Sequence, residues 1–379
     1  MSGLLVVAGE ASGDRVAAEV VRRLPGVRAF GLGGSALSSV GAELVDDLRA
    51  STALGIGEAA ARAGAVLRSW RRVASAARAR RPVAAMLVNY SEYNARLAPL
   101  LHDAGVRVLW YGAPQVWAWR PGRTEALRRS VDRMALMLPF EEPLWRRSGV
   151  DAHYVGHPAL ETPRLDRRAA REALEMTPFA AAVAVLPGSR PHEVRRLLLP
   201  MLDAYERVRS DRASVDARVL VAPSLDASTR HWVRAVCLER RVGHFDADPH
   251  RGALSVLPAF DAALCASGTA SLEAALCRVV PVVAYRVGLA TELTARVLVR
   301  TPHIALPNVL LGERVFSELV QREVRVDRLA AALGDALDRR PALLGACARV
   351  EATLGTQRTP SLGVARMLAP WLGLDASAA

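Results

Sequence analysis

The sequence predicts an α/β protein of two domains built on parallel sheets, and the order of its apolar segments supports this. Short apolar runs typical of buried strands alternate with amphipathic segments typical of helices, and that alternation favours parallel sheets covered on both faces. A chain of 379 residues is long enough for two such domains. Hydrophobic residues make up 51% of it and charged residues 23%, which is a globular composition and excludes a disordered chain.

The first strand is expected from Leu4 to Ala8. It ends in Gly9 and a loop of small residues, after which a helical pattern begins. Strand, tight loop and helix in this order open a βα unit. Similar apolar runs recur along the chain with helical stretches between them: Ala84–Val88, Val106–Tyr111, Met134–Leu138, Ala181–Leu186, Arg218–Ala222, Ala262–Cys265 and Val279–Ala284. The polar, proline-containing stretch 158–178 predicts the domain boundary, and a helical tail over 350–372 closes the chain.

The basic residues are all Arg, and they give the chain a formal net charge of +12. An excess of positive charge favours anionic partners such as nucleotides, phosphates and anionic lipid headgroups. Four cysteines without CxxC spacing indicate buried free thiols in a reducing cytoplasm. The N-terminus lacks the pattern of a signal peptide, and no apolar run reaches the roughly 18 residues of a membrane span, so any membrane contact is predicted to be peripheral.

The segment Ala59–Arg81 combines an apolar helical stripe with seven Arg and no acidic residue. Such a helix could rest on anionic lipid at a membrane surface. It could equally be an ordinary helix that packs its stripe against a sheet and leaves its cations in solvent. Both interpretations stay open at this point.

Small-residue loops follow several of the expected strands. AGEASGD (8–14) and GLGG (31–34) lie in the first half of the chain, and LPGSRPHEV (186–194) and SGTASLEAAL (267–276) lie in the second. Ligands of open parallel sheets bind at the carboxyl ends of strands, where helix N-termini offer free N–H groups. Arg190 adds a bidentate fork that suits a diphosphate, and Glu273 could accept hydrogen bonds from a ribose. Each loop alone also fits an ordinary capped turn, but two in one domain favour a nucleotide site.

Nothing in the sequence indicates a metal site. Asp246-Ala247-Asp248 resembles a metal-binding DxD, but it stands in a proline-containing loop and is interpreted as a turn that leads into a helix. His157, in the sequence GHP, is interpreted as a structural turn residue. No cluster of His or Cys suggests zinc.

Eight motifs in chain order resemble those of the lipid-A-disaccharide synthases. They extend over nearly the whole chain: AGEASGD (8–14), GLGGSALSSVGAE (31–43), APQVWAWRPGR (113–123), LPFE (138–141), YVGHPAL (154–160), LPGSRPHEV (186–194), SGTASLEAAL (267–276) and LPNVLLGERVFSELVQ (306–321). The resemblance implies the GT-B fold, with two Rossmann-like domains that face a cleft. Residues 1–165, completed by a C-terminal helix over about 350–379, would bind the acceptor, and residues 166–349 would bind the UDP-sugar.

The activity that the resemblance implies is the inverting transfer of 2,3-diacylglucosamine from UDP-2,3-diacylglucosamine to 2,3-diacylglucosamine 1-phosphate (lipid X). The products would be the β(1→6)-linked lipid A disaccharide 1-phosphate and UDP. The family works without an obligatory metal, so we expect neither a metal nor another cofactor. The resemblance also implies a cytoplasmic protein held peripherally at the inner membrane of a Gram-negative-type bacterium and a possible homodimer, and no motif indicates a nucleic-acid partner.

The same resemblance assigns site residues by their positions in the motifs. Glu92 is the candidate base, and Arg190 and Asn308 complete the catalytic set. The UDP-sugar side comprises Gly188, Ser189, Arg190, Glu193, Ser267, Gly268, Thr269, Glu273, Asn308, Glu318 and Gln321. The acceptor side comprises Gly9, Glu10, Ser12, Gly13, Asn89, Gln115, Trp117, Trp119, Arg120 and Arg123. An inverting transfer needs a base at the acceptor hydroxyl and cationic or helix-terminal groups at the leaving UDP.

The chain departs from the family pattern at a few positions. VNYSEYN (88–94) stands where the family usually has IDAPDFN, so the two Asp positions are Asn89 and Glu92. Glu92 keeps the carboxylate but reaches one methylene farther, and a displacement of about 1 Å can cost on the order of 100-fold in rate. APQVWAW replaces the usual SPSVWAW, and Glu313 stands where an Arg is expected near the donor.

Three alternative functions stay open. A divergent paralogue would use a UDP-sugar with a different acceptor. An epimerase of the same fold would act on UDP-N-acetylglucosamine. A binder of nucleic acid or membrane would use the positive charge without catalysis, in which case binding should depend steeply on salt.

Overall fold

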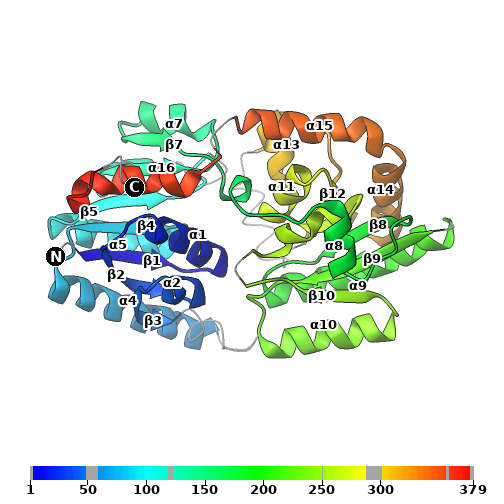
Figure 1. The fold of residues 1–379 in the computed structure, drawn as a ribbon, viewed down its shortest axis with the longest axis horizontal. Coiled ribbons are helices and arrows are strands. Elements are labelled where there is room, and N and C mark those ends of the chain that lie inside the picture. Colours follow the sequence, from blue (N-terminus) through cyan, green and yellow to red (C-terminus); the bar gives the residue numbers. More distant parts are fainter. Residues whose placement is uncertain are drawn as a thin grey trace. The chain divides into compact units, whose positions relative to one another are not determined.

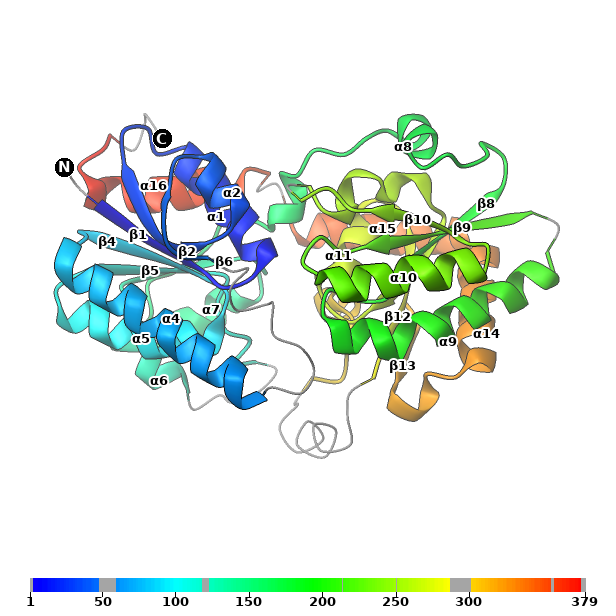
Figure 2. The same cartoon turned by 90° about the horizontal axis from the view of Figure 1, so that it is seen from below.

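The computed structural model describes residues 3–47, 59–117, 123–212, 214–249, 251–286, 301–355 and 358–375. The chain forms two compact units, drawn in Figure 1 and Figure 2. The first, here called the N-unit, comprises Met1–Glu161 and Thr356–Ala379, and the second, the C-unit, comprises Thr162–Gly355. Each unit has a parallel sheet with helices on both faces, which confirms the predicted fold class.

Among the described residues, the sheet of the N-unit has seven parallel strands in the order β3-β2-β1-β4-β5-β6-β7. Their bounds are β1 Gly3–Ala8, β2 Arg28–Gly33, β3 Glu43–Asp47, β4 Ala84–Val88, β5 Arg107–Tyr111, β6 Arg133–Leu136 and β7 Ala152–Tyr154. The helices are α1 Ala11–Arg22, α2 Ser35–Ser39, α4 Ala59–Arg80, α5 Ser91–Asp103, α6 Arg123–Arg128, α7 Glu141–Arg147, the 3-10 helix η1 Pro158–Leu160 and α16 Pro360–Leu372.

Alternate residues of the central strands of this sheet are buried in two separate layers. In β1, Leu5 and Val7 belong to a core cluster with α4 and α5, whereas Leu4 and Val6 belong to a cluster with α1 and α16. All four side chains are at most 1% exposed. A strand that is buried on both faces has apolar side chains at consecutive positions. This continuous apolar run is why β1 could be predicted from the sequence.

The sheet of the C-unit, in the part that the structure describes, has six parallel strands in the order β10-β9-β8-β11-β12-β13. Their bounds are β8 Ala181–Leu186, β9 Val215–Val221, β10 Gly243–Asp246, β11 Ala262–Ala266, β12 Val280–Tyr285 and β13 Glu318–Val320. The helices are α8 Arg167–Ala173, α9 Pro191–Ser210, α10 Ala227–Glu239, α11 Thr269–Leu276, α13 Leu306–Leu311, α14 Val326–Asp338, α15 Arg340–Thr353 and the 3-10 helices η2 Ala253–Ser255, η3 Leu257–Ala259 and η4 Gln321–Glu323.

The helical tail predicted for the end of the chain is two helices, of which α15 belongs to the C-unit and α16 to the N-unit. The start of α16 is fixed by Glu161, whose carboxylate accepts hydrogen bonds from Arg23 Nη2 at 2.8 Å and from the N–H of Ser361 at 3.0 Å. Arg23 Nε also donates to Ser361 Oγ at 2.6 Å. Because Glu161 ends the first segment of the N-unit, this cluster ties the two segments of that unit together.

Helix α4 packs as an ordinary helix where its side chains are described. Val73, Ala74 and Ala77 are buried in the core of the N-unit, and Trp70 packs against that core. Leu67 is 46% exposed. The apolar stripe of α4 therefore packs against the sheet, as the interpretation of an ordinary helix predicted. Only the exposed side of the helix, which includes Leu67, is available for another contact.

The strand order of each sheet changes direction once. From β1 the chain adds β2 and β3 on one side and then returns to place β4 on the other; from β8 it adds β9 and β10 and then places β11 on the other side. Open α/β sheets bind ligands outside the carboxyl ends of the strands at such a switch point. The loops after β1 and β4 and the loops after β8 and β11 therefore mark the candidate sites.

Candidate functional site

The C-unit brings two of the predicted loops together at its switch point. Gly188–Arg190 follows β8, and Ser267–Thr269 follows β11. The two strands pair in parallel with Leu186 opposite Cys265, so the loops begin side by side. Each loop leads into a helix, α9 or α11, whose first N–H groups have no acceptor within the helix. This arrangement is typical of a site for phosphate groups.

Glu193 fixes the first of these loops. Its carboxylate accepts hydrogen bonds from the N–H of Ser189 and from Arg190 Nη1, both at 3.2 Å. Gly188 has a φ of +130°, and a Cβ there would approach the Cβ of Glu193 to 2.6 Å, so the position requires glycine. The side chain of Arg190 is 56% exposed, against 16% for Glu193. The guanidinium is thus held at the start of α9 and remains accessible to an anion.

The second loop is accessible at the start of α11. Gly268 and Thr269 are exposed, and a Cβ on Gly268 would meet no atom within 4 Å. Ser267 anchors the loop, because its Oγ donates to the carbonyl of Ile304 and its N–H to the carbonyl of Ala284, both at 3.1 Å. Glu273 is half-buried in the next turn of α11.

Tyr285, at the end of β12, is a residue of this site that the sequence reasoning missed. Burial raises the pKa of Tyr285, Glu193 raises it further and Arg190 lowers it, so the phenol lies within electrostatic range of both. Its partner on β13 is Val320, which directly precedes Gln321. Tyr285 directly follows the predicted strand Val279–Ala284. The other candidate site residues were also predicted from positions after strands, so this position could have identified Tyr285.

Asn308 and Glu318 lie inside the C-unit, with 0% and 5% of their surfaces exposed. Asn308 Nδ2 donates to Glu318 Oε1 at 2.8 Å and to the carbonyl of Phe316 at 2.9 Å. Its Oδ1 accepts from the N–H groups of Val315 at 3.1 Å and Phe316 at 3.0 Å. Both donors and both lone pairs of this amide are therefore in use. Direct contact of Asn308 or Glu318 with a substrate, as predicted, does not fit this burial.

Glu318 extends this network to the loop Ser267–Thr269. Its Oε1 accepts from the N–H of Ile304 at 3.2 Å and from the N–H of Ala305 at 2.9 Å. The carbonyl of Ile304 in turn accepts from Ser267 Oγ. A continuous chain of hydrogen bonds therefore runs from Asn308 through Glu318 to Ser267, which gives Asn308 a means of positioning that loop.

In the N-unit, the loops after β1 and β4 meet at the other switch point. Ala8 is opposite Val88, so Gly9 and Asn89 follow side by side. A Cβ on Gly9 would lie only 1.9 Å from the ring of Tyr90, so that position requires glycine. The predicted acceptor residues Gly9 and Asn89 are thus neighbours, and the ring of Tyr90 lies against them.

Two carboxylates flank this position. Glu10 directly precedes α1, Glu92 stands in the first turn of α5, and both are exposed. Burial raises the pKa of the half-buried Tyr90, and Glu10 adds to the rise, so the phenol lies near Glu10. The candidate base is therefore accessible, and a second carboxylate lies across the same switch point.

Asp14 has a structural role at the end of the AGEASGD motif. Its carboxylate is 4% exposed and accepts from the N–H groups of Gly34 at 2.7 Å, Ala36 at 2.9 Å and Leu37 at 3.2 Å. It thereby caps α2 and joins α1 to the end of β2. The prediction of GLGG (31–34) as a loop is wrong, because Gly31, Leu32 and Gly33 belong to β2 and only Gly34 lies between β2 and α2. Of the predicted acceptor residues beside Asp14, Ser12 is half-buried and Gly13 is buried.

Trp117 is held by a glutamate that the sequence reasoning did not single out. Its Nε1–H donates to Glu141 at 3.0 Å, and its ring meets that of Phe140 edge-on with centroids 5.1 Å apart. Glu141 is 3% exposed; burial raises the pKa of its carboxyl to about 7, while the bond from Trp117 lowers it. A buried carboxyl therefore supports the segment that carries several predicted acceptor residues.

The other predicted residues of that segment are placed only in part. Gln115 is exposed. Trp119 and Arg120 lie outside the described residues. Arg123 begins α6, but its side chain is also outside the described part.

His157 is a structural residue at the start of η1, as interpreted from the sequence, whereas the DAD sequence is a turn only in part, because Asp246 is the last residue of β10. His157 is 6% exposed, its Nδ1 accepts from the N–H of Ala159 at 3.2 Å, and burial lowers its pKa to about 4. Asp248 accepts from the N–H of Arg251 at 2.7 Å. Within the described ranges, no three His, Cys, Asp or Glu side chains gather as a metal site would require.

Three further features bear on the predictions. Glu313 forms an ion pair with Arg349 of α15. The four cysteines are free and buried. Over the part of the chain that the structure describes, no helix has both the length and the apolar character needed to cross a membrane.

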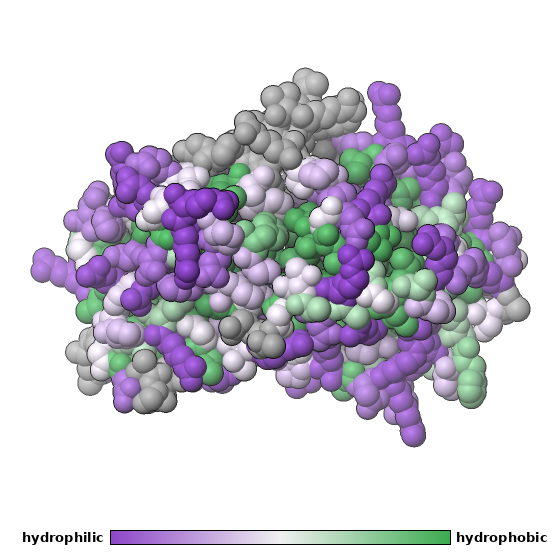
Figure 3. Space-filling model, turned by 90° about the horizontal axis from the view of Figure 1, so that it is seen from above, coloured by the Kyte–Doolittle hydropathy of each residue, from purple (hydrophilic) through white to green (hydrophobic). Residues whose placement is uncertain are grey.

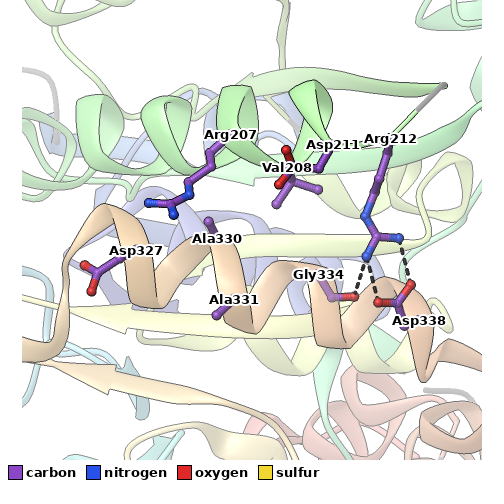
Figure 4. Close-up of a pocket in the computed structure, with 9 residues that line it drawn as sticks. All are labelled: Arg207, Val208, Asp211, Arg212, Asp327, Ala330, Ala331, Gly334 and Asp338. Atoms are coloured by element: carbon purple, nitrogen blue, oxygen red, sulfur yellow. Dashed lines mark hydrogen bonds and ion pairs between the residues drawn. The ribbon is translucent and has the colours of Figure 1, made fainter.

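The pocket drawn in Figure 4 lies between α9 and α14, away from the switch point. It encloses about 520 Å³, and at one end Arg212 pairs with Asp338 at 2.7 Å. Arg207 and Arg212 lie at the end of α9, whereas loop 188–190 precedes its start. At about 1.5 Å per helical residue these points are roughly 24 Å apart, so the pocket is not part of the candidate site.

Comparison with known proteins identifies the family. A family model described as lipid-A-disaccharide synthetase matches residues 4–340. A lipid-A-disaccharide synthase of Anaeromyxobacter dehalogenans (strain 2CP-C) is 39% identical over 366 residues, 94% of each chain. One of Myxococcus xanthus (strain DK1622) is 41% identical over 339 residues, 86% of each chain.

Solved structures share the fold at low sequence identity. A structure of S. aureus MnaA with UDP has a TM-score of 0.69 at 10% identity and covers 99% of this chain and 98% of that chain. A candidate UDP-N-acetylglucosamine 2-epimerase from Listeria monocytogenes has a TM-score of 0.68 at 12% identity, with coverage of 99% and 98%. These likenesses show the fold alone, whereas the family match extends across both switch points. The protein therefore belongs to the lipid-A-disaccharide synthase family of glycosyltransferases.

Proposed function

We propose that this protein transfers 2,3-diacylglucosamine from UDP-2,3-diacylglucosamine to the 6-hydroxyl of 2,3-diacylglucosamine 1-phosphate, with inversion. The products are the β(1→6) disaccharide 1-phosphate and UDP. Family membership supports this reaction, and the names of the relatives state it as synthesis of the lipid A disaccharide. The observation that carries the proposal is the pair of loops at the C-unit switch point, where Arg190 and two helix starts lie on neighbouring strand ends.

In this proposal the C-unit binds the UDP of the donor. Arg190 pairs with the diphosphate through its planar fork, and the N–H groups of Ser267–Thr269 contribute the helix N-terminus. Glu273 accepts hydrogen bonds from the ribose hydroxyls. As the bond between the sugar C1 and the β-phosphate oxygen breaks, that oxygen keeps the electron pair, and these groups stabilise the charge that develops on it.

Glu92 serves as the base in the N-unit. Its carboxylate takes the proton from the 6-hydroxyl as that oxygen attacks C1 on the face opposite the leaving UDP, which inverts the configuration at C1. The exposure of Glu92 in the first turn of α5 supports the role, because a base must reach the substrate hydroxyl. No metal or other cofactor enters this sequence of steps.

Asn308 is proposed as a positioning residue and not as a group that contacts the sugar. Its hydrogen-bond chain through Glu318 and Ile304 ends on Ser267, the first residue of the nucleotide loop. Substitution of Asn308 would remove the hydrogen bond that its Nδ2 donates to Glu318. The loop that begins at Ser267 would then be held less firmly. The expected effect is a higher KM for the UDP-sugar.

Peripheral contact with the anionic inner membrane is proposed through the exposed face of α4. Leu67 is 46% exposed, and Arg71 and Arg78 of the same helix are exposed. Figure 3 shows the side of the molecule away from α4, where hydrophilic side chains project from a surface of mixed hydropathy. Binding to vesicles that contain anionic lipid should weaken with salt and with Arg71→Gln, and equal binding to neutral vesicles would contradict the role of charge.

The proposed reaction is tested by a mass-spectrometric assay with both lipid substrates and no added metal. Wild type should form the disaccharide 1-phosphate, and Glu92→Gln and Arg190→Ala should lose most of that activity while they keep the wild-type melting temperature. Arg195→Gln, in α9 past the first turn that follows Arg190, is the control and should stay active. A folded wild type that binds UDP but yields no product would favour the paralogue with another acceptor.

The epimerase alternative predicts a different product. An epimerase would convert UDP-N-acetylglucosamine to UDP-N-acetylmannosamine without any acceptor. The solved structure of a candidate epimerase shares the fold of this chain at 12% identity, which does not extend to its activity. Incubation with UDP-N-acetylglucosamine alone, followed by separation of the two UDP-sugars, distinguishes the two functions.

A further inference from the structure

The ring of Tyr90 occupies the switch point of the N-unit. Tyr90 directly precedes α5, between the carboxyl ends of β1 and β4. A Cβ added to Gly9 would lie 1.9 Å from Cδ1 and 2.0 Å from Cγ of this ring. Because ligands of open α/β sheets enter at the switch point, the ring forms the floor of the position that an acceptor would approach.

The backbone holds this ring in place. Asn89 and Tyr90 both have left-handed φ values, +49° and +44°, which residues other than glycine adopt rarely. Asn89 is fixed from both sides: its N–H donates to the carbonyl of Tyr111 at 3.0 Å, and its own carbonyl accepts from Asn94 Nδ2 at 2.9 Å. Asn94 is 0% exposed. The backbone that carries the ring of Tyr90 is therefore held on the Asn89 side by two hydrogen bonds.

A second ring packs on the ring of Tyr90. Tyr93 is 3% exposed and stacks on Tyr90 with centroids 4.9 Å apart and an angle of 22° between the planes. Its hydroxyl lies 3.5 Å from Ser69 Oγ of α4. The ring of Tyr90 thus stacks on Tyr93 and lies against Gly9, and its bulk would displace an acceptor outward from the strand ends.

This displacement gives a reason for the length of Glu92. Glu92 follows Tyr90 by two residues, in the first turn of α5, and its carboxylate reaches one methylene farther than that of an Asp at the same position would. We propose that Tyr90 and Glu92 are a coupled specificity pair: the ring sets how deeply the acceptor sugar enters, and the longer carboxylate meets the displaced 6-hydroxyl. The proposal rests on the assignment of Glu92 as the base.

The position of the ring can be tested without any activity. Gly9→Ala should lower the melting temperature of the wild type clearly, because the new methyl group meets the ring of Tyr90. In the Tyr90→Ala background the same change should have little effect. Equal losses in the two backgrounds would show that the ring does not fill this space and would overturn the proposal.

The coupling itself is tested by a kinetic double-mutant cycle on the disaccharide reaction. Glu92→Asp alone should lower kcat by about 10- to 100-fold, because the carboxylate then falls about 1 Å short. Tyr90→Ala with Glu92→Asp should recover at least about tenfold of that loss, since the acceptor can then sit deeper. Tyr90→Phe, which keeps the ring and removes only the hydroxyl, is the matched control and should not rescue Glu92→Asp.

The outcomes separate this proposal from the one on which it rests. If Glu92→Gln abolishes turnover and the cycle is additive, Glu92 remains the base and the coupling to Tyr90 is wrong. If Glu92→Gln keeps wild-type kcat, the base is a different group and both proposals fail. Rescue of Glu92→Asp by Tyr90→Ala, and not by Tyr90→Phe, supports the pair.

Discussion

Glu141→Gln should change how the stability of this protein depends on pH. Glu141 is 3% exposed, and burial raises the pKa of its carboxyl from 4.5 to about 7 although the bond from Trp117 opposes the rise. Between these pH values the unfolded chain has released a proton that the folded protein still holds. The free energy of unfolding therefore falls as pH rises through this window and levels off above pH 7.

The size of the effect follows from the two pKa values. At about 1.36 kcal/mol per unit of pKa, a rise from 4.5 to about 7 corresponds to roughly 3 kcal/mol. Gln has nearly the same shape as Glu, keeps an oxygen for the Trp117 N–H and does not titrate. Glu141→Gln should therefore become more stable relative to the wild type as pH rises from 4.5 to about 7. The difference between their free energies of unfolding should grow by about 3 kcal/mol over this range, because all other groups titrate alike in both proteins.

Urea unfolding of both proteins at intervals from pH 4 to pH 8 measures this difference. Trp117→Phe is an informative companion, because it removes the donor that lowers the pKa of Glu141 and should extend the fall in stability to higher pH. Stability curves of the wild type and Glu141→Gln that stay parallel from pH 4 to pH 8 would refute the reasoning. They would mean that Glu141 is ionised in the folded protein at the same pH as in the unfolded chain.

Three further outcomes are expected. His157→Asn should show a pH dependence of stability opposite to that of Glu141→Gln, because burial lowers the pKa of His157 from 6.5 to about 4. In the same urea titration, the wild type should lose roughly 3 kcal/mol of unfolding free energy relative to this variant as pH falls across that range. Arg190→Lys keeps the charge but loses the fork, and should raise KM for the UDP-sugar about tenfold while the acceptor KM is unchanged; an unchanged donor KM would count against the diphosphate contact. Asp14→Ala leaves three buried N–H groups without their acceptor and should cost about 2 kcal/mol or more of unfolding free energy, so an unchanged urea midpoint would contradict its capping role.

The strands that the sequence revealed are those buried on both faces. β1, β4, β8 and β11 are central strands with continuous apolar runs. The edge strands β3, β7, β10 and β13 were not predicted: β3 and β10 are largely exposed or half-buried, and β7 and β13 have three residues each. A short strand at the edge of a sheet needs fewer apolar side chains, so no run marks it in the sequence.

The loops of the candidate site could be anticipated because their signal is local. A small-residue turn that stands between an apolar run and a helical pattern is predicted to lie at the carboxyl end of a strand. Gly188 and Gly268 have the positive φ values that such turns need. The resemblance to the family motifs then suggested the roles proposed for these loops. The assignment of substrate contacts to individual residues stays a prediction.

The sequence by itself determined the fold class, the family and the loops that follow the buried strands, because periodicity and turn chemistry are written in neighbouring residues. Only the tertiary structure decided which side chains are accessible. Asn308 is buried among donors and acceptors seven to ten residues along the chain, Asp14 caps a helix about 20 residues away, and Glu141 holds Trp117 across 24 residues. Burial and hydrogen bonding over such separations depend on how strands and helices pack, and the order of residues in a motif does not contain that information.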